Sequence, residues 1–271
     1  MTSRENATFI GFGNMGSAIV DAIFKKKCFD QITVIEPDNK KTKDLKKQSI
    51  LTDIKISKEI NKSKYVWICV KPQLFNKISL DLKSFLDQDQ ILISIMAGIT
   101  KNQIIEQTNH LKVVRIMPNT PAQISKGISV WNTTNNINSD EKTIIENSLN
   151  SFGKSIYVDK EEIINLSTAL SGSGPGFFYR ILESFIIAGE KAGLDKTISK
   201  KLAIETFIGS AELINSSSYT PEELRIAVTS PGGTTEAGLN YLEKINIDQV
   251  ITQTIKEAVN RGNELSKESD N

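Results

Sequence analysis

Apolar residues in the first part of the chain gather in short runs, separated by longer segments whose apolar positions recur at helical spacing. From Ala7 to about Asp159 the runs are TFIG (8–11), ITVIE (32–36), YVWICV (65–70), ILISIMA (91–97), VVRIM (113–117), GISVW (127–131) and SIYVD (155–159). The helical segments between them are Asn14–Lys27, Asn39–Gln48, Gln73–Leu86, Lys101–Asn109 and Asp140–Phe152. This alternation predicts βα units in a parallel sheet, forming one doubly wound domain.

Strand-like runs stop after Asp159, and the rest of the chain has helical spacing. The expected helices are Glu161–Thr168, Phe177–Ala192, Ser199–Asn215, Pro221–Val228, Thr235–Lys244 and Asp248–Ser266. The pattern therefore predicts an α/β protein in which a Rossmann-type domain over residues 1–160 is followed by an all-α domain over residues 161–271.

One expected helix is apolar on most of its sides. It contains FFYRILESFIIAGEKAG (177–193), and a helix that is apolar all round is normally buried. A domain of roughly 110 residues has difficulty covering such a helix alone. We therefore expect a partner subunit to cover it in a homodimer, with the alternative that a monomer buries it against its own neighbouring helices.

Composition narrows the class of protein. The 271 residues give a prior of roughly two domains, and 39% hydrophobic with 24% charged residues is typical of soluble globular proteins. A net charge of +1 gives no electrostatic footprint for nucleic acid or an anionic membrane. The apolar runs are too short to span a bilayer, and the first residues lack the features of a signal peptide. With only Cys28 and Cys69 a disulfide framework is excluded, so we expect a cytoplasmic protein, and we expect no metal site.

A glycine motif follows the first apolar run. Gly11-Phe12-Gly13-Asn14-Met15-Gly16 fits G-x-G-x-x-G, opens an expected helix and is followed by a second strand that ends in Glu36. Gly11 would permit the tight turn, Gly13 the approach of a pyrophosphate, and Gly16 close packing of helix and strand. Free N–H groups at the helix start, including those of Asn14 and Met15, would bind the phosphates. The alternative is an ordinary glycine turn between a strand and a helix.

Glu36 bears on which dinucleotide binds. A carboxylate at this strand end accepts hydrogen bonds from ribose hydroxyls and repels a 2′-phosphate, which favours NAD(H). Lys40 and Lys41 lie just downstream and could reach a 2′-phosphate. The alternative for Glu36 is a solvated surface acid.

Later strand ends point to the same crevice, because ligands of open α/β sheets lie beyond the carboxyl ends of the strands. Asn119 lies between two prolines in MPNTP (117–121), a stiff loop suited to a nicotinamide or a substrate, or simply a rigid turn. The remaining cofactor-binding candidates at these ends are Cys69, Lys71, Pro72, Ala97 and Gly98.

Two clusters rich in glycine and hydroxyl groups lie in the helical half. One is SGSGPG (171–176), and the other is TSPGGTT (229–235), directly before an expected helix. Consecutive glycines before a helix form a nest of N–H groups for a carboxylate, and the neighbouring hydroxyls add donors and acceptors. The alternative is a flexible loop between helices.

These motifs together identify a resemblance to the pyrroline-5-carboxylate reductases over nearly the whole chain. The matching segments are IGFGNMG (10–16), VKPQ (70–73), MPNTP (117–121), TALSGSGPGFF (168–178) and PEELRIAVTSPGGTTEAGLNYLE (221–243). Ala169 and Gly176 vary the usual SGSGP block. The resemblance implies hydride transfer from NAD(P)H to the imine carbon of (S)-1-pyrroline-5-carboxylate, which gives L-proline in the final step of proline biosynthesis.

The resemblance also implies roles for the second cluster. Backbone N–H groups around Gly232, Gly233 and Thr234 would hold the substrate carboxylate, and Ser230 would shape the loop. Thr235 would hydrogen-bond the ring nitrogen as the catalytic residue. The resemblance further implies NADP(H) or NAD(H) as the cofactor and a homodimer formed by the helical domain, with a higher oligomer left open.

Two rivals have distinguishing features. A β-hydroxyacid dehydrogenase would need a lysine where this chain has Phe178, and a phenyl ring transfers no proton. A dinucleotide-binding regulator without turnover has no need of the TSPGGTT nest. The single histidine, His110, is expected at the surface and not as an acid or base in the active site. A substrate that enters as a protonated imine needs no strong general acid, because orientation and electrostatics can carry the reaction.

Overall fold

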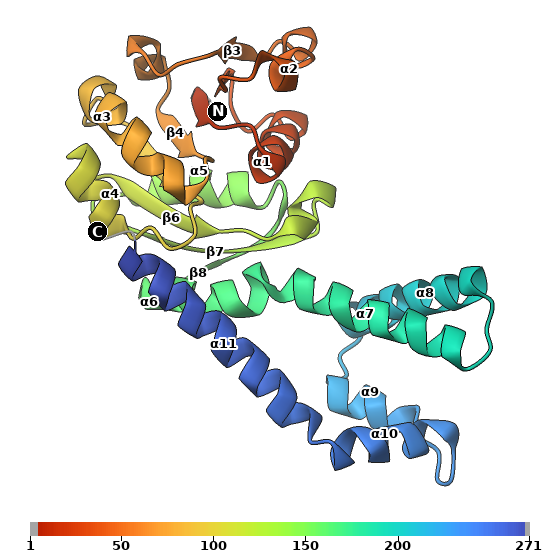
Figure 1. The fold of residues 1–271 in the computed structure, drawn as a ribbon. Helices are drawn as coiled ribbons and strands as arrows, with labels where there is room; N and C mark the ends of the chain where they lie inside the picture. Colours follow the sequence, from red (N-terminus) through yellow and green to blue (C-terminus); the bar gives the residue numbers. More distant parts are fainter. Residues whose placement is uncertain (1–4, 269–271) are drawn as a thin grey trace. The chain divides into compact units, whose positions relative to one another are not determined.

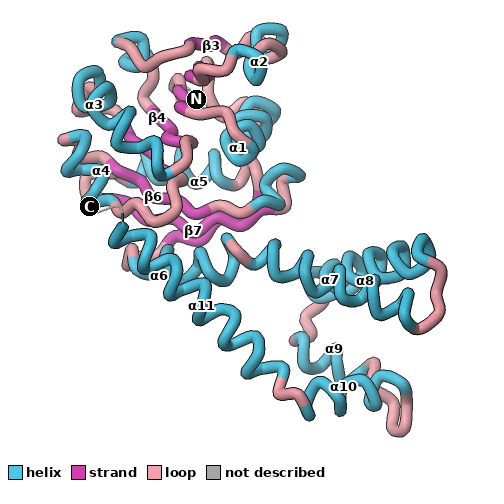
Figure 2. Tube along the Cα trace, viewed as in Figure 1, coloured by secondary structure: helices cyan, strands magenta, loops and turns pink. Residues whose placement is uncertain are grey.

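A computed structural model describes residues 5–268 (Figure 1). The chain divides into two compact units. One runs to Ser173 and includes the segment from Ala258 onward, and the other is Gly174–Glu257. Figure 2 shows that the strands all belong to the first unit, as far as the chain is described. The predicted domain boundary after residue 160 stays a prediction.

An eight-stranded sheet forms the centre of the first unit in the described residues, in the order β3-β2-β1-β4-β5-β6-β7-β8. The order reverses between β1 and β4, which is the point where open α/β sheets bind ligands. The doubly wound prediction is therefore confirmed. The strands are β1 (Ala7–Ile10), β2 (Ile32–Ile35), β3 (Leu51–Asp53), β4 (Tyr65–Ile68), β5 (Ile91–Ser94), β6 (Val113–Met117), β7 (Gly127–Thr133) and β8 (Gly153–Tyr157).

Alternation along buried strands builds a core on each face of the sheet. In β4, Tyr65 and Trp67 join the core that also contains Ile19 of α1, while Val66 and Ile68 join the opposite core. Side chains of successive strand residues point to opposite faces, so a run of apolar residues serves both. Helices α1 and α5 cover one face and α3 and α4 the other (Figure 1). The helices of this unit are α1 (Asn14–Lys25), α2 (Asn39–Thr42), α3 (Phe75–Phe85), α4 (Lys101–Thr108), α5 (Ser139–Leu149) and α6 (Glu162–Ser167).

The sheet departs from the predicted all-parallel arrangement at one pair. Strands β6 and β7 run antiparallel, whereas β7 and β8 are parallel. A parallel crossover takes a dozen or more residues, and the segment between Met117 and Gly127 holds only a 3₁₀ turn, Thr120–Ile124. The short connection therefore reverses the chain direction.

Two local predictions in the second βα unit were wrong. The predicted helix Asn39–Gln48 is α2 followed by a separate 3₁₀ turn, Leu45–Gln48. Lysines three and four residues apart repel one another along this segment, which weakens a continuous helix. Strand β3 has three residues and was not predicted, because so short a strand carries no alternation to detect.

The second unit is helical in its described part, as predicted. Helix α7 packs on α8, where Ser199 Oγ donates to the carbonyl of Ile186 (2.7 Å). A Cβ on Gly189 would lie only 2.3 Å from Ser199 Oγ, so glycine allows this contact. The helices are α7 (Gly174–Lys191), α8 (Lys196–Ser216), α9 (Pro221–Ala227), α10 (Thr234–Lys244) and α11 (Ile247–Glu268), the last of which extends into the first unit. Within residues 5–268, none of the helices combines the length and apolar character required to cross a membrane.

Several large apolar side chains of this unit are exposed to solvent in the single chain. On α7, Phe178 is 54% exposed, Tyr179 57% and Phe185 67%. The alternative in which one chain buries this helix against its own neighbours therefore does not describe the structure.

Candidate functional site

The glycine loop joins β1 to α1 at the carboxyl edge of the sheet. Gly11 has φ +97°, and a Cβ there would lie 2.9 Å from the backbone carbon and oxygen of Cys69. A Cβ on Gly16 would lie 2.6 Å from the carbonyl oxygen of Gly11 and 3.1 Å from Cys69 Cβ. Close approach of the loop, α1 and the end of β4 therefore requires glycine at both positions.

Gly13 is different, because nothing lies within 4 Å of the place where its Cβ would be. Its backbone is extended (φ −80°, ψ −170°), and it is the N-cap of α1 without a side-chain capping bond. Gly13 and Asn14 are exposed, Met15 is half-buried, and the first turn of a helix has N–H groups without intrahelical acceptors. The loop thus presents free donors and an open backbone surface at a helix N-terminus, which fits a pyrophosphate.

Glu36 is buried, at 8% exposure, so it is not a solvated surface acid. Its Oε2 accepts from the backbone N–H of Phe12 (2.9 Å), and its Oε1 accepts from that of Asp38 (3.2 Å). Lys41 Nζ lies 3.3 Å from the same Oε1. Glu36 therefore fastens the end of β2 to the glycine loop and holds one of the two candidate lysines in an ion pair.

The other cofactor-binding candidates follow the ends of β4, β5 and β6. Lys71 is exposed and starts a 3₁₀ turn at Pro72, and Ala97 and Gly98 (φ +78°) are partly exposed. Burial raises the pKa of the Cys69 thiol to about 12, so the thiol stays protonated at neutral pH and only its backbone borders the loop. The structure thus places these candidates and the glycine loop at the carboxyl edge of one sheet.

Asn119 uses its side chain within the chain itself. Its Oδ1 accepts from the N–H of Ile128 (2.9 Å), and its Nδ2 donates to the carbonyl of Ser171 (3.1 Å). The residue is 8% exposed. Its amide therefore ties the loop after β6 to β7 and to the π-helical turn Thr168–Gly172.

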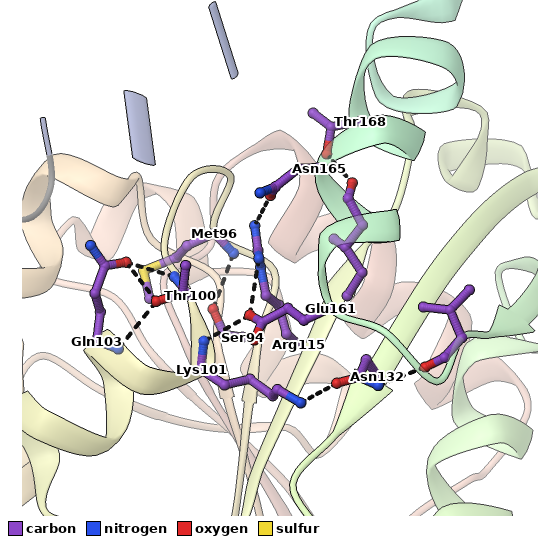
Figure 3. Close-up of polar contacts among 12 residues, drawn as sticks. Ser94, Met96, Thr100, Lys101, Gln103, Arg115, Asn132, Glu161, Asn165 and Thr168 are labelled. Atoms are coloured by element: carbon purple, nitrogen blue, oxygen red, sulfur yellow. Dashed lines mark hydrogen bonds and ion pairs between the residues drawn. The ribbon is translucent and has the colours of Figure 1, made fainter. Parts of the chain in front are cut away.

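A polar network behind these loops was missed at the sequence level (Figure 3). Arg115 lies within β6 at 2% exposure and donates through Nη1 to Glu161 Oε1 (3.0 Å) and through Nη2 to Asn165 Oδ1 (2.8 Å). Lys101 donates from its backbone N–H to Glu161 Oε1 (2.8 Å) and from Nζ to Asn132 Oδ1 and the carbonyl of Thr133. Burial lowers the pKa of Lys101, against the opposing effect of Glu161. An arginine inside the apolar run VVRIM was the one available signal.

The surface position expected for His110 was wrong. The residue is fully buried, with Nε2 2.8 Å from the carbonyl oxygen of Gln90. Asn109, in the left-handed region at φ +55°, ends α4 and turns the chain inward just before β6. His110 thus lies at the amino edge of the sheet, away from the glycine loop.

The second glycine cluster forms the turn before α10. Gly232 has φ +72°, and its N–H donates to Glu236 Oε2 (2.8 Å), while the N–H of Gly233 donates to the carbonyl of Ser230 (2.9 Å). Thr234 and Thr235 begin the helix, with Gly233 as its N-cap. One N–H of the predicted carboxylate nest therefore already holds a carboxylate of this chain. In the described residues, no cluster of three or more His, Cys, Asp or Glu could hold a metal ion.

Comparison with known proteins identifies the family. Residues 161–265 match the family model for pyrroline-5-carboxylate reductase dimerisation, and residues 6–98 match that for NADP oxidoreductase, coenzyme F420-dependent. A pyrroline-5-carboxylate reductase of Staphylococcus haemolyticus is 32% identical over 97% of this chain and 98% of its own length. The chain belongs to the pyrroline-5-carboxylate reductase family. A second member, pyrroline-5-carboxylate reductase 1 of Bacillus subtilis, is 31% identical over 98% of this chain and 91% of its own length.

Solved structures of the family have the same fold. The pyrroline-5-carboxylate reductase of Coxiella burnetii superposes with a TM-score of 0.91 at 31% identity, covering 97% of this chain and 99% of that one. The Plasmodium falciparum pyrroline carboxylate reductase, solved with NADP bound, gives 0.85 at 28% identity over 97% and 98% of the two chains. The predicted Rossmann-type domain followed by a helical domain is thus confirmed.

Proposed function

We propose that this chain reduces (S)-1-pyrroline-5-carboxylate to L-proline with a reduced nicotinamide dinucleotide. The observation that carries the proposal is identity of 32% with a pyrroline-5-carboxylate reductase over 97% of the chain, a span that includes the glycine loop and the TSPGGTT turn. Two local features support it: the glycine loop has an open backbone at the start of α1, and the turn holds the Glu236 carboxylate on the N–H of Gly232.

The glycine loop is proposed to hold the dinucleotide. N–H groups of Asn14 and Met15 at the start of α1 bind the pyrophosphate, next to the open backbone of Gly13. Backbone at Cys69–Pro72, Ala97–Gly98 and Asn119 borders the rest of the ligand, beyond the ends of β4, β5 and β6. When bound, the dinucleotide supplies the hydride, and the protein contributes orientation of the two reactants.

The turn before α10 is proposed to hold the substrate. The N–H groups of Gly232, Gly233 and Thr234 receive its carboxylate, which replaces Glu236 on the N–H of Gly232. Without substrate, the carbonyl of Ser230 accepts from the N–H of Gly233 and closes the turn, and the substrate carboxylate replaces it there. The hydroxyl of Thr235 accepts from or donates to the ring nitrogen and steadies its charge as the imine becomes an amine.

We propose NADH as the better donor. The buried Glu36 carboxylate has lone pairs left for ribose hydroxyls after its bonds to Phe12 and Asp38. A 2′-phosphate beside it would meet like charge, partly offset by Lys41. Family resemblance and the match to an NADP oxidoreductase model leave NADPH as the second donor.

We also propose a homodimer formed by the helical unit. Exposed side chains on α7, including Phe178 and Phe185, need an apolar partner, and residues 161–265 match a dimerisation model. A cytoplasmic location and the absence of a nucleic-acid partner stay predictions.

The test is the absorbance at 340 nm of NADH or NADPH mixed with purified protein and pyrroline-5-carboxylate. We expect oxidation with both donors, and a higher kcat/KM with NADH. Oxidation with NADPH favoured keeps the reductase and overturns the role of Glu36. No oxidation with either donor overturns the proposed function.

A further inference from the structure

The buried network around Arg115 adjoins two loops at the carboxyl edge of the sheet, where the dinucleotide is proposed to bind. Arg115 is paired in register with Ser94, the last residue of β5, and with Asn132 of β7. Two residues further along β6 is Met117, after which the loop containing Asn119 begins. The guanidinium is therefore anchored at the end of the strand that carries one predicted cofactor-binding loop.

Glu161 connects this strand to the neighbouring loop. One oxygen, Oε1, accepts both from Arg115 Nη1 (3.0 Å) and from the backbone N–H of Lys101 (2.8 Å). Lys101 is the first residue of α4, three positions after the Gly98 turn. A single carboxylate oxygen thus connects the start of α4 to β6 (Figure 3). Because α4 follows the loop with Ala97–Gly98 and β6 precedes the loop with Asn119, this oxygen also fixes the two loops relative to each other.

The segment that supplies Glu161 is itself held against the same edge. Asn165 of α6 accepts from Arg115 Nη2, and the carbonyl of Ser171 accepts from Asn119. A Cβ on Gly172 would lie 2.9 Å from Met117 Cε, so the π-helical turn packs closely on the end of β6. Turns of π-helix are rare and are frequently found at functional sites.

Stability alone does not account for such a network. A buried ion pair is often no more stabilising than well-packed apolar residues of similar volume. The Arg115 Nε–H, moreover, lacks a partner in the described residues. What the network does provide is a fixed geometry of two loops from different strands.

We propose that Glu161 and Arg115 are positioning residues for hydride transfer. They hold the Ala97–Gly98 turn and the Met117–Asn119 loop in the arrangement that orients the nicotinamide end of the dinucleotide. This inference rests on the proposed function, deepens it, and gives neither residue a contact with the substrate.

The structure offers a matched control in Glu141. Its side chain is 9% exposed, its Oε1 lies 2.8 Å from Lys112 Nζ and 3.6 Å from Lys64 Nζ, and its Oε2 accepts from a helix-capping N–H of Asn138. The two lysines immediately precede β6 and β4, so this carboxylate lies at the amino edge of the same sheet. Glu141→Gln therefore removes a carboxylate that is more deeply buried than Glu161, whose side chain is 21% exposed, and it leaves the carboxyl edge of the sheet untouched.

The experiment compares Glu161→Gln with Glu141→Gln at saturating pyrroline-5-carboxylate and dinucleotide. For Glu161→Gln we expect kcat to fall by about tenfold or more, since small displacements of reactants have effects up to about a hundredfold. We expect its KM for the dinucleotide to stay within about threefold, because the phosphate-binding loop is untouched. Glu141→Gln should keep kcat within about twofold of the wild type, even if its Tm falls as much as that of Glu161→Gln.

A milder variant covers the case in which Glu161→Gln does not fold. Asn165→Ala removes the hydrogen bond from Arg115 Nη2 and leaves the ion pair with Glu161. We expect kcat to fall less than in Glu161→Gln, again without a change in KM for the dinucleotide. Equal kcat in the Glu161 and Glu141 variants, or an effect on KM alone, would overturn the positioning role.

A second readout separates this inference from the proposed function. The fluorescence of NADH bound to the protein reports the surroundings of the nicotinamide ring without any substrate. We expect its emission to change in Glu161→Gln and not in Glu141→Gln. If the wild-type protein binds NADH without reducing pyrroline-5-carboxylate, the proposed function fails and this comparison still decides the inference. If the wild-type protein binds no dinucleotide, both fail.

Discussion

Adding one methyl group at Gly13 and at Gly16 should separate dinucleotide binding from folding. At Gly16 the new Cβ would lie 2.6 Å from the Gly11 carbonyl oxygen, a backbone atom that no side-chain rotation can move. Overpacking of this kind costs about 1–3 kcal/mol, and each kcal/mol lowers Tm by about 2–4 °C in a domain of this size. Gly16→Ala should therefore melt several degrees below the wild type.

At Gly13 the same methyl group meets nothing within 4 Å, and the backbone conformation suits alanine. Loss of a favourable N-cap residue and the lower entropy of the unfolded chain act in opposite directions, and each is worth about 0.5–1 kcal/mol. Gly13→Ala should keep the wild-type Tm to within about 3 °C.

For dinucleotide binding the order should be reversed, with Gly13→Ala affected more than Gly16→Ala. The methyl group at Gly13 occupies the surface that a pyrophosphate must approach, so we expect Kd for NADH to rise about tenfold or more, equivalent to about 1.4 kcal/mol. Thermal melting and fluorescence titration with NADH measure the two effects. Unchanged affinity in Gly13→Ala would show that the pyrophosphate does not lie there, and a wild-type Tm in Gly16→Ala would refute the packing argument.

Three further predictions concern Thr235, the Glu36–Lys41 pair and His110. Thr235→Ala should lower kcat by one to two orders of magnitude, about 1.4–2.8 kcal/mol in the barrier, while Thr235→Ser keeps the hydroxyl and most of the rate; full turnover in the alanine variant excludes the hydroxyl from the mechanism. Glu36→Gln should shift the ratio of kcat/KM values toward NADPH and Lys41→Met toward NADH, each by about tenfold, and shifts of the same sign would contradict opposite roles for the pair. Because burial lowers the pKa of His110 from its ordinary 6.5, the unfolded chain binds more protons and stability falls as pH drops below 6.5 until the native imidazole titrates. His110→Gln should therefore have a Tm that depends less on pH between about 7 and 5, and parallel Tm curves for the two proteins would count against this.

The sequence predicted those features that depend on neighbouring residues. Strand β4 was evident from the apolar run at 65–70, and the loop before α1 was evident from its three glycines. The reversal at β7 was not, although the short segment between Met117 and Gly127 signals it once loop length is considered.

Features that depend on distant residues could not be predicted in this way. Arg115 and Glu161 are 46 positions apart, and Glu36 reaches Phe12 across 24. Periodicity gives no information on such pairs, since they form only after the strands align. The burial of His110 is of the same kind, because its partner is the carbonyl of Gln90 before another strand.

Reduction of the imine by direct hydride transfer can be tested by following the transferred hydrogen itself. The protein would be given pyrroline-5-carboxylate and NADH in which both hydrogens on C4 of the nicotinamide are deuterium, and the product would be analysed by mass spectrometry. We expect proline with a single deuterium on the former imine carbon, formed at the rate at which absorbance at 340 nm is lost. Proline without deuterium, or dinucleotide oxidation without proline, would contradict direct hydride transfer to the imine.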